Sequence, residues 1–219
     1  MLLLRELQAL LARINDAEVA EDVRDFLITD RRTLRRCHAP SARAATPEAL
    51  LVSESDTGLA MSLYLDADLL RRLARRSPLE HLDDDNLEDF CTALEGVSHF
   101  HCVAFSAARG WSVSLLALEM QADIDKYALG VLLAGQQRGG VLVAGLHPRL
   151  FERVRYRDDL DGRTRRLYAD ANRYAARFCR RLEERFLRRR EARVRDMLGE
   201  LRRFYRLGDA GKLRAIEAV

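Results

Sequence analysis

The sequence lacks the features of a membrane-spanning protein and of a disulfide-stabilised secreted domain. No stretch of its 219 residues approaches the roughly 18 uninterrupted apolar residues that a membrane span needs. The leucine-rich N-terminus is interrupted by Arg5 and Glu6 and continues at helical spacing, which predicts an amphipathic helix instead of a signal peptide. The four cysteines are far apart and have no CxxC spacing. We therefore expect free thiols, a cytoplasmic protein and no membrane partner.

Common fingerprints of catalysis and cofactor binding are also missing. The chain has no glycine-rich phosphate loop ending in Gly-Lys-Ser/Thr, no His-Glu-x-x-His metalloprotease motif and no Gly-x-Ser-x-Gly nucleophile elbow. Gly139-Gly140 precedes an apolar run, but no lysine or helix cap follows at a useful spacing, so we expect a plain turn there. The sequence motifs therefore indicate neither a particular cofactor nor a particular metal.

Lysine is scarce: Lys126 and Lys212 accompany 35 arginines. A GC-rich genome produces the same bias, so we expect a bacterial-type protein and give arginine preference little weight as evidence for phosphate recognition. The charges are sorted by position. Residues 149–207 hold 20 arginines and 10 acidic residues, a net charge of +10, whereas residues 1–148 hold 15 basic and 22 acidic residues, a net charge of −7. The basic part is expected either to meet an external polyanion or to fold back on acidic residues of its own chain or of a second copy.

Hydrophobic periodicity predicts an α+β fold with three segments. Residues 1–37 form an N-terminal helical segment with a break near Asn15-Asp16, residues 49–147 an α+β core, and residues 148–219 an Arg-rich helical region that can pack on the core as one domain. Residues 38–47, rich in proline and small polar residues, are expected to be a linker.

Two hairpin-helix units are predicted in the core. Residues 50–54 and 59–65 flank the turn signal Asp56-Thr57-Gly58, and a basic helix follows from Asp66. A helix near residue 87 is expected to stop at Gly96, so that residues 100–107 and 111–119 pair as strands around Arg109, with another helix from Met120. Together these elements predict one antiparallel sheet of about four strands packed with helices.

The register of the second predicted hairpin brings polar residues together. If the turn is centred on Arg109, His99 lies opposite Glu119. Glu95 and Asp123 are each about one helical turn beyond this pair, and Lys126 lies on the same side as Asp123. The candidate catalytic residues are therefore His99, Glu119, Glu95, Asp123 and Lys126.

A neutral imidazole beside carboxylates suits two kinds of chemistry. It can act as a general base held by an orienting acid, or it can form part of a divalent metal site. The structural alternative is a buried or rim histidine paired with Glu119, with Asp123 near a helix N-terminus. A register slip of one residue would move the side chains of one strand to the opposite face of the sheet and separate these residues.

A helical signal runs from about Arg163 to Arg206. Its apolar stripe predicts one long helix, or two helices bent near Arg188-Arg189-Arg190. Beside the stripe, arginines recur every three or four residues; this arginine row consists of Arg173, Arg177, Arg181, Arg185 and Arg188. The row could follow a phosphate backbone, with Tyr174 stacking on a base. It could equally be a solvated face whose arginines pair with nearby acidic residues, including those of the stretch 83–89.

Three functions follow from these patterns. The sequence favours binding of nucleic acid or another phosphate-rich ligand through the arginine row and Tyr174. The first alternative is a metal-assisted or acid/base hydrolytic enzyme that uses the residues around His99 and Glu119. The second is an oligomeric interaction module without catalytic activity, in which the arginine row meets the acidic N-terminal part of a second copy. The C-terminal helix could also form a homodimer.

Overall fold

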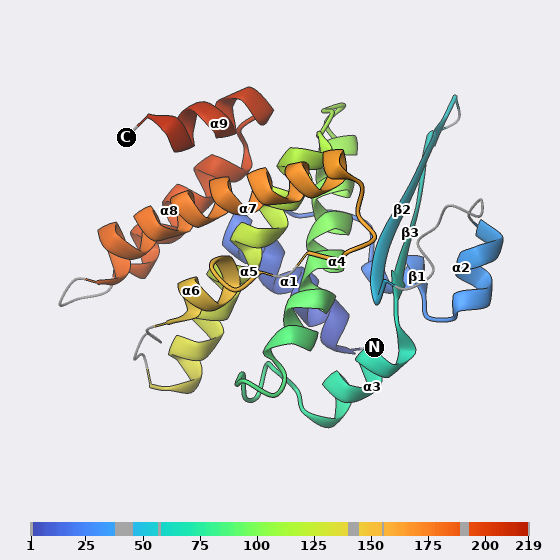
Figure 1. Cartoon of the computed structure of the whole chain (residues 1–219), viewed down its shortest axis with the longest axis horizontal. Helices are drawn as coiled ribbons and strands as arrows, with labels where there is room; N and C mark the ends of the chain where they lie inside the picture. The colour runs from blue at the N-terminus through green and yellow to red at the C-terminus, as the bar shows by residue number, and fades with distance from the viewer. Residues whose placement is uncertain are drawn as a thin grey trace.

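The protein is described by a computed structural model that covers residues 2–37, 46–56, 58–139, 145–154, 156–188 and 193–218. Helices account for most of these residues, and a small sheet stands beside the main group of helices, with the helix of residues 31–37 on its far side (Figure 1). None of the helices in the described part combines the length and apolar character that a membrane span requires. Most of the predicted linker, Gly140 of the predicted turn and the end of the Arg188-Arg190 run lie outside the described residues.

The N-terminal segment begins with α1 (Leu2–Asn15), which ends where Asp16 adopts a left-handed φ of 51°. This confirms the predicted break at Asn15-Asp16. The helix predicted after it is wrong in part, because the chain instead forms the 3₁₀ turn η1 (Val23–Phe26), the short strand β1 (Leu27–Ile28) and the helix α2 (Arg31–Cys37). Strand pairing at Leu27 overrides the helical periodicity there.

The sheet has three strands in the order β1-β3-β2. Strands β2 (Glu48–Ser55) and β3 (Gly58–Leu65) form an antiparallel hairpin, which confirms the first predicted hairpin. Strand β1 runs parallel to β3, so the sheet is mixed. The helix α3 (Ala67–Arg75) begins at the predicted N-cap, Asp66, whose side chain accepts a hydrogen bond from the backbone N–H of Asp68.

The second predicted hairpin is wrong. Two long helices, α4 (Leu87–Ala107) and α5 (Leu115–Gln137), take its place and pack against each other. Phe100, Cys102 and Phe105 of α4 are all buried, so this part of the helix is covered on several sides. A continuous apolar run of this kind has the same pattern as a buried strand. The predicted sheet of four antiparallel strands is therefore a mixed sheet of three, and the fold is more helical than expected.

The C-terminal region forms several helices instead of one long helix. The order is α6 (Leu146–Phe151), α7 (Gly162–Leu182), the π-helical turn η2 (Glu183–Leu187), α8 (Val194–Tyr205) and α9 (Asp209–Glu217). The bend after α7 agrees with the second of the two predicted alternatives. In Figure 1, α7 crosses α5, and α9 lies beyond α7 on the side away from α6. Asp161 caps α7 by accepting hydrogen bonds from the N–H groups of Arg163 and Thr164.

One hydrophobic core joins the three predicted segments. Its buried members include Leu4 in α1, Phe90 and Phe100 in α4, Phe178 in α7 and Ile216 in α9. The apolar stripe of the C-terminal region is thus buried within its own chain, and the α4-α5 pair lies at the centre of the packing.

Gly96 sets the distance between the hairpin and α4. A Cβ atom at this position would lie 2.8 Å from Cδ1 of Leu63 and 2.9 Å from Cγ of Glu48. Both approaches are shorter than van der Waals contact. Gly96 was expected to end the helix, but it lies inside α4, where its missing side chain allows the sheet to approach. The outcome is that Glu48 lies directly against α4.

We predict that Gly96→Ala destabilises the fold. The added methyl group gains about 1 kcal/mol in helix propensity. It also pushes Leu63 and Glu48 away from α4, which costs about 1–3 kcal/mol and outweighs the gain. Gly199→Ala in α8 is the matched control, because a Cβ there meets nothing within 4 Å, and it should stabilise the protein by about 0.5–1 kcal/mol. Urea unfolding measures both variants; equal stabilisation by the two changes would contradict the packing argument.

Candidate functional site

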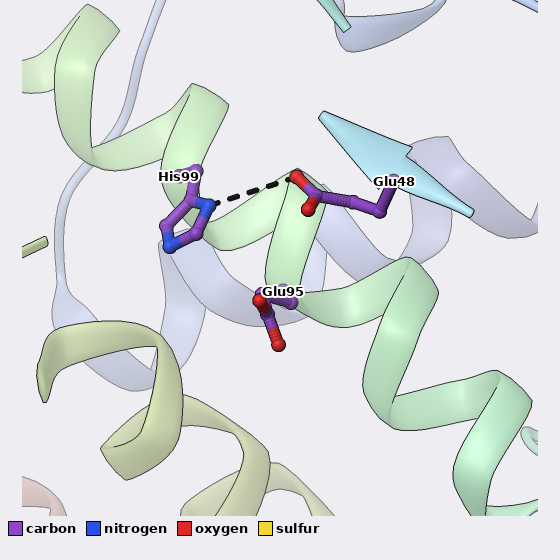
Figure 2. Close-up of side chains that lie close together, drawn as sticks. All are labelled: Glu48, Glu95 and His99. Carbon is purple, nitrogen blue, oxygen red and sulfur yellow. Dashed lines mark ion pairs between the residues drawn. The ribbon is translucent and has the colours of Figure 1, made fainter. Parts of the chain in front are cut away.

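His99 on α4 lies between carboxylates from two other elements. Its Nδ1 is 3.6 Å from Oε1 of Glu48, the first residue of β2, and its Nε2 is 3.5 Å from Oε2 of Glu119 on α5. Figure 2 shows the side chains of Glu48 and His99 pointing toward each other, with Glu95 beside them on the same helix as His99. The hairpin and both central helices therefore meet at one imidazole ring.

Lys126 joins two further carboxylates. Its Nζ is 2.8 Å from Oε2 of Glu95 on α4 and 2.7 Å from Oδ1 of Asp123 on α5. The two helices are thus linked at two adjacent points, by His99 and by Lys126. We call this group the His99 cluster; it consists of Glu48, Glu95, His99, Glu119, Asp123 and Lys126.

The His99 cluster is shielded from solvent but open at one point. The side chains of His99 and Glu48 are 6% and 12% exposed, whereas that of Glu95 is 32% exposed. Oε1 of Glu48 and Nε2 of His99 are buried, and neither makes a hydrogen bond to any described residue. A buried polar atom without a hydrogen bond costs about 1–3 kcal/mol. Oε1 of Glu48 therefore favours a further partner beside Nδ1 of His99, whereas Nε2 faces Glu119.

Burial and neighbouring charges shift the pKa values on the His99 side of the cluster. Burial raises the pKa of Glu48 above its usual range, and His99 offsets this only in part. Burial alone would lower the pKa of His99, but the carboxylates of Glu119 and Glu48 raise it well above its usual value. The positions of these protons therefore depend on each other.

Lys126 has a similar effect on its two carboxylates. Burial raises the pKa of Asp123, and Lys126 does not fully offset that change. For Glu95, the attraction of Lys126 outweighs burial and lowers the pKa. Burial also acts against the charged form of Lys126, but Asp123 and Glu95 hold its pKa well above the usual value. The ammonium group thus stays protonated near neutral pH.

The His99 cluster has more acidic groups than its own cations neutralise. Four carboxyl groups accompany one ammonium group and one imidazole. Its net charge is −3 with every carboxyl ionised and a neutral imidazole, and −2 with a protonated imidazole. Uncompensated charge in a shielded site is costly. Either some of the carboxyl groups take up protons, or a cation binds.

Three of these residues are placed to hold a metal ion. Glu48, Glu95 and His99 each offer a donor atom, and the three atoms lie within 4.8 Å of one another. An ion bound at about 2.0–2.2 Å needs donor atoms about 3–4 Å apart, so a small side-chain rotation would complete the site. A nitrogen and oxygen donor set suits Zn²⁺ or Mn²⁺ better than Ca²⁺ or Mg²⁺, which prefer oxygen alone.

The structure brings together all five residues that the sequence nominated: His99, Glu119, Glu95, Asp123 and Lys126. They meet across two helices instead of two strands, so the strand hairpin that was predicted to join them is wrong. Their catalytic roles stay a prediction. Glu48 was missed, because it belongs to a strand far away in the sequence and no local pattern links it to His99. The one signal in that direction was Gly96, which was interpreted as a helix stop.

The arginine row is partly used within the chain. Arg181 is half-buried and donates a hydrogen bond to the backbone oxygen of Ala215 in α9, at 2.8 Å. Arg173 forms an ion pair with Asp170, and Arg188 with Glu183. Arg177 and Arg185 have exposed side chains. The arginines of the row therefore differ in their availability to a ligand. Arg181 would have to break its hydrogen bond to α9 before it could bind a phosphate group.

Tyr174 and the acidic stretch 83–89 have partners as well. The guanidinium carbon of Arg173 is 4.8 Å from the centre of the Tyr174 ring, a cation–π contact that covers one face of the ring. In the acidic stretch, Asp83, Asp85 and Asp89 pair with arginines of α3 and its C-cap, and Asp84 pairs with Arg149. The ion pairs of the acidic stretch are thus made by arginines outside the row.

A second polar group lies deep in the helical core. Asp125 is 1% exposed and accepts hydrogen bonds from Asn15, Ser98 and Gln121. The ammonium group of Lys212 on α9 donates to the side-chain oxygen of Gln121 at 2.9 Å. This network fastens α1, α4, α5 and α9 together. Nearby, Nδ1 of the buried His101 lies 3.0 Å from the hydroxyl oxygen of Tyr205.

No protein-family model, curated protein or solved structure matches this chain.

We predict that His101 makes the protein sensitive to acid. Burial lowers the pKa of His101 to about 4, below the value of about 6.5 in the unfolded chain. Between these two pH values the unfolded state binds a proton that the folded state does not, so stability falls as the pH falls through this window. Lowering the pH from 7 to 4.5 should cost about 2–3 kcal/mol through this residue.

Urea unfolding of His101→Gln at both pH values measures this contribution. The variant should lose less stability on acidification than the unmodified protein, by about 2–3 kcal/mol. His81→Gln is the matched control, because the side chain of His81 is 70% exposed. If both variants respond to acid like the unmodified protein, His101 does not have the expected role.

Proposed function

We propose that the protein binds a divalent transition-metal ion through Glu48, Glu95 and His99 and uses it in a hydrolytic reaction. The observation that carries this proposal is the excess of carboxyl groups around a buried histidine, with donor atoms within 4.8 Å of one another. A cation at this position would neutralise the excess charge and would give Oε1 of Glu48 the partner that it lacks among the described residues.

The geometry supports a specific division of roles. Nδ1 of His99 faces Glu48, so this nitrogen is the proposed ligand. The opposite ring nitrogen faces Glu119 at 3.5 Å. A ligating histidine commonly donates its second N–H to a carboxylate, which fixes the ring orientation and makes the ligand more basic. Glu119 is thus proposed as the residue that orients His99.

Lys126 and Asp123 supply the remaining chemistry. When bound, a metal ion would lower the pKa of a water molecule and polarise a substrate oxygen. Asp123 is 20% exposed and shares Lys126 with the proposed ligand Glu95, and it is proposed to accept and return the proton of that water molecule. The ammonium group of Lys126 would stabilise negative charge that develops on the substrate. Substrate would approach from the side of Glu95, the most exposed of the proposed ligands.

Metal binding is tested by calorimetric titration of the metal-stripped protein with Zn²⁺ and with Mn²⁺. We expect one saturable site, and a thermal midpoint that rises when the ion is present. Glu48→Gln and His99→Gln should each weaken binding at least about tenfold, because metal ligation by the neutral amide is weaker. Glu54→Gln is the matched control, since Glu54 lies on the same strand and is exposed.

Two results would contradict this proposal. One is the absence of saturable binding by either ion. The other is binding that Glu54→Gln weakens as much as Glu48→Gln does, because that would place the ion outside the His99 cluster.

A second proposed function, binding of nucleic acid or another polyanion, is favoured by the charge of α7. This helix contains seven arginines and one acidic residue, Asp170. The side chains of Arg173 and Arg180 are 67% and 57% exposed. Such a surface attracts phosphate groups over a long range.

The double variant Arg173→Glu/Arg177→Glu tests this second function, because both residues are exposed, whereas Arg181 is half-buried and bonded to α9. Fluorescence anisotropy with labelled oligonucleotides should show affinity that falls as salt rises, and at least about tenfold weaker binding by the variant. Arg75→Glu on α3 serves as the control. Oligonucleotide affinity that is the same in both variants would rule out α7 as the binding surface.

A further inference from the structure

A pocket lies between α5, α6 and the end of α7, lined by residues outside the His99 cluster. Its volume is about 470 Å³, within the range of about 300–1,000 Å³ typical of small-molecule sites. Val131, Tyr127 and Leu187 form apolar parts of the wall, and all three are buried. Arg180 and Arg188 contribute positive charge to the lining, and Glu152 and Glu183 contribute carboxylates. The pocket therefore combines an apolar wall with charged groups.

Both carboxylate oxygens of Glu183 accept hydrogen bonds from other residues of the pocket lining. One of its oxygens accepts a hydrogen bond from the hydroxyl group of Tyr127 at 3.0 Å, and the other accepts one from Nε of Arg188 at 2.9 Å. Because this pair uses the inner nitrogen of Arg188, it does not need the two terminal nitrogens of the guanidinium group. Arg188 is thus held in position and keeps donors for another acceptor.

Arg180 is held more weakly. Its terminal nitrogen is 3.2 Å from Oε1 of Glu152, and the two side chains are 57% and 55% exposed. Exposed pairs of this kind contribute only about 0–1 kcal/mol. An incoming anion can therefore replace Glu152 as the partner of Arg180 at little cost.

The backbone around the pocket also has an unusual conformation. The five residues Glu183–Leu187 form a π-helical turn, and two of them line the pocket. Such turns are rare and occur often at functional sites. Opposite them, His147 contacts the backbone oxygen of Ala176 through Nε2 at 2.8 Å. Since a carbonyl oxygen can only accept, this nitrogen carries a proton, and Nδ1 of a neutral ring is left as an acceptor.

We propose that this pocket binds a small organic anion that carries a carboxylate or phosphate group on a ring-sized apolar body. Arg180 and Arg188 bind the anionic group, and Val131, Tyr127 and Leu187 contact the apolar body. A planar guanidinium group is suited to both anions because it donates two parallel hydrogen bonds. This binding needs neither the His99 cluster nor a polyanion on α7.

Phenyl phosphate and benzoate are the probes that test this proposal, and benzyl alcohol is the neutral probe of the same size. Binding is followed by titration with calorimetry or ligand-detected nuclear magnetic resonance. Saturable binding of at least one anion, with benzyl alcohol at least about tenfold weaker, supports the proposal. The comparison of the two anions shows whether the site prefers phosphate or carboxylate. If neither anion binds, or if benzyl alcohol binds equally well, the proposal is wrong.

Two variants of one ion pair give a sharper test. Arg180→Gln should weaken binding of the anion about tenfold or more, because it removes a charged donor. Glu152→Gln should strengthen binding up to about fivefold, because it removes the competing carboxylate. If the Arg180–Glu152 ion pair only supports the structure, both variants should change the anion affinity in the same direction. That result would overturn the proposal.

Control variants locate the site. Arg75→Gln on α3 lies outside the pocket lining and outside α7, and it should leave the affinity for the anion unchanged. Val131→Trp should abolish binding by filling the pocket, with circular dichroism confirming that the variant is folded. Retained affinity in a folded Val131→Trp protein would place the anion elsewhere.

Discussion

The close approach of the β2-β3 hairpin to α4 at Gly96 determines which carboxylate reaches His99 in the proposed site. A side chain at this position would collide with Leu63 and with Glu48. Because the helix has no side chain there, Glu48 reaches His99, and a carboxylate from the sheet joins two helices. Without this contact the cluster would be an ordinary set of ion pairs between α4 and α5. The missing side chain at Gly96 thus allows the sheet to supply Glu48 to the proposed metal site.

The two lysines show how the chain distributes positive charge. In a protein with 35 arginines, both lysines are at shielded polar groups: Lys126 between two carboxylates, and Lys212 against Gln121 in the core. A compact ammonium group on a flexible stem fits such positions, whereas the broad guanidinium group suits planar pairing at the surface. The arginines of α3 and α7 make surface pairs of that kind. The two lysines therefore occupy shielded positions that favour a compact cation.

The sequence predicted the members of the site better than the structure that holds them. His99 and Glu119 are equally far from Arg109, so an antiparallel pair of strands or helices joined near this residue places them at a similar level. In the helical pair both side chains also face the partner helix, which brings them together. Glu95, Asp123 and Lys126 follow at helical spacing. What failed was the distinction between a buried helix and a buried strand, since both are continuously apolar. Glu48 and the short strand β1 could not be predicted, because tertiary packing alone brings them to α4 and β3.

The most direct test of the account is an X-ray experiment on crystals soaked with Mn²⁺ or Zn²⁺. An anomalous difference map recorded near the absorption edge of the metal identifies its position. The account predicts a peak bounded by Nδ1 of His99 and the carboxylates of Glu48 and Glu95, at ligand distances of about 2.0–2.2 Å. A map with no peak there, and with His99 in direct hydrogen bonds to Glu48 and Glu119, would contradict it and would leave the cluster as a buried network of ion pairs.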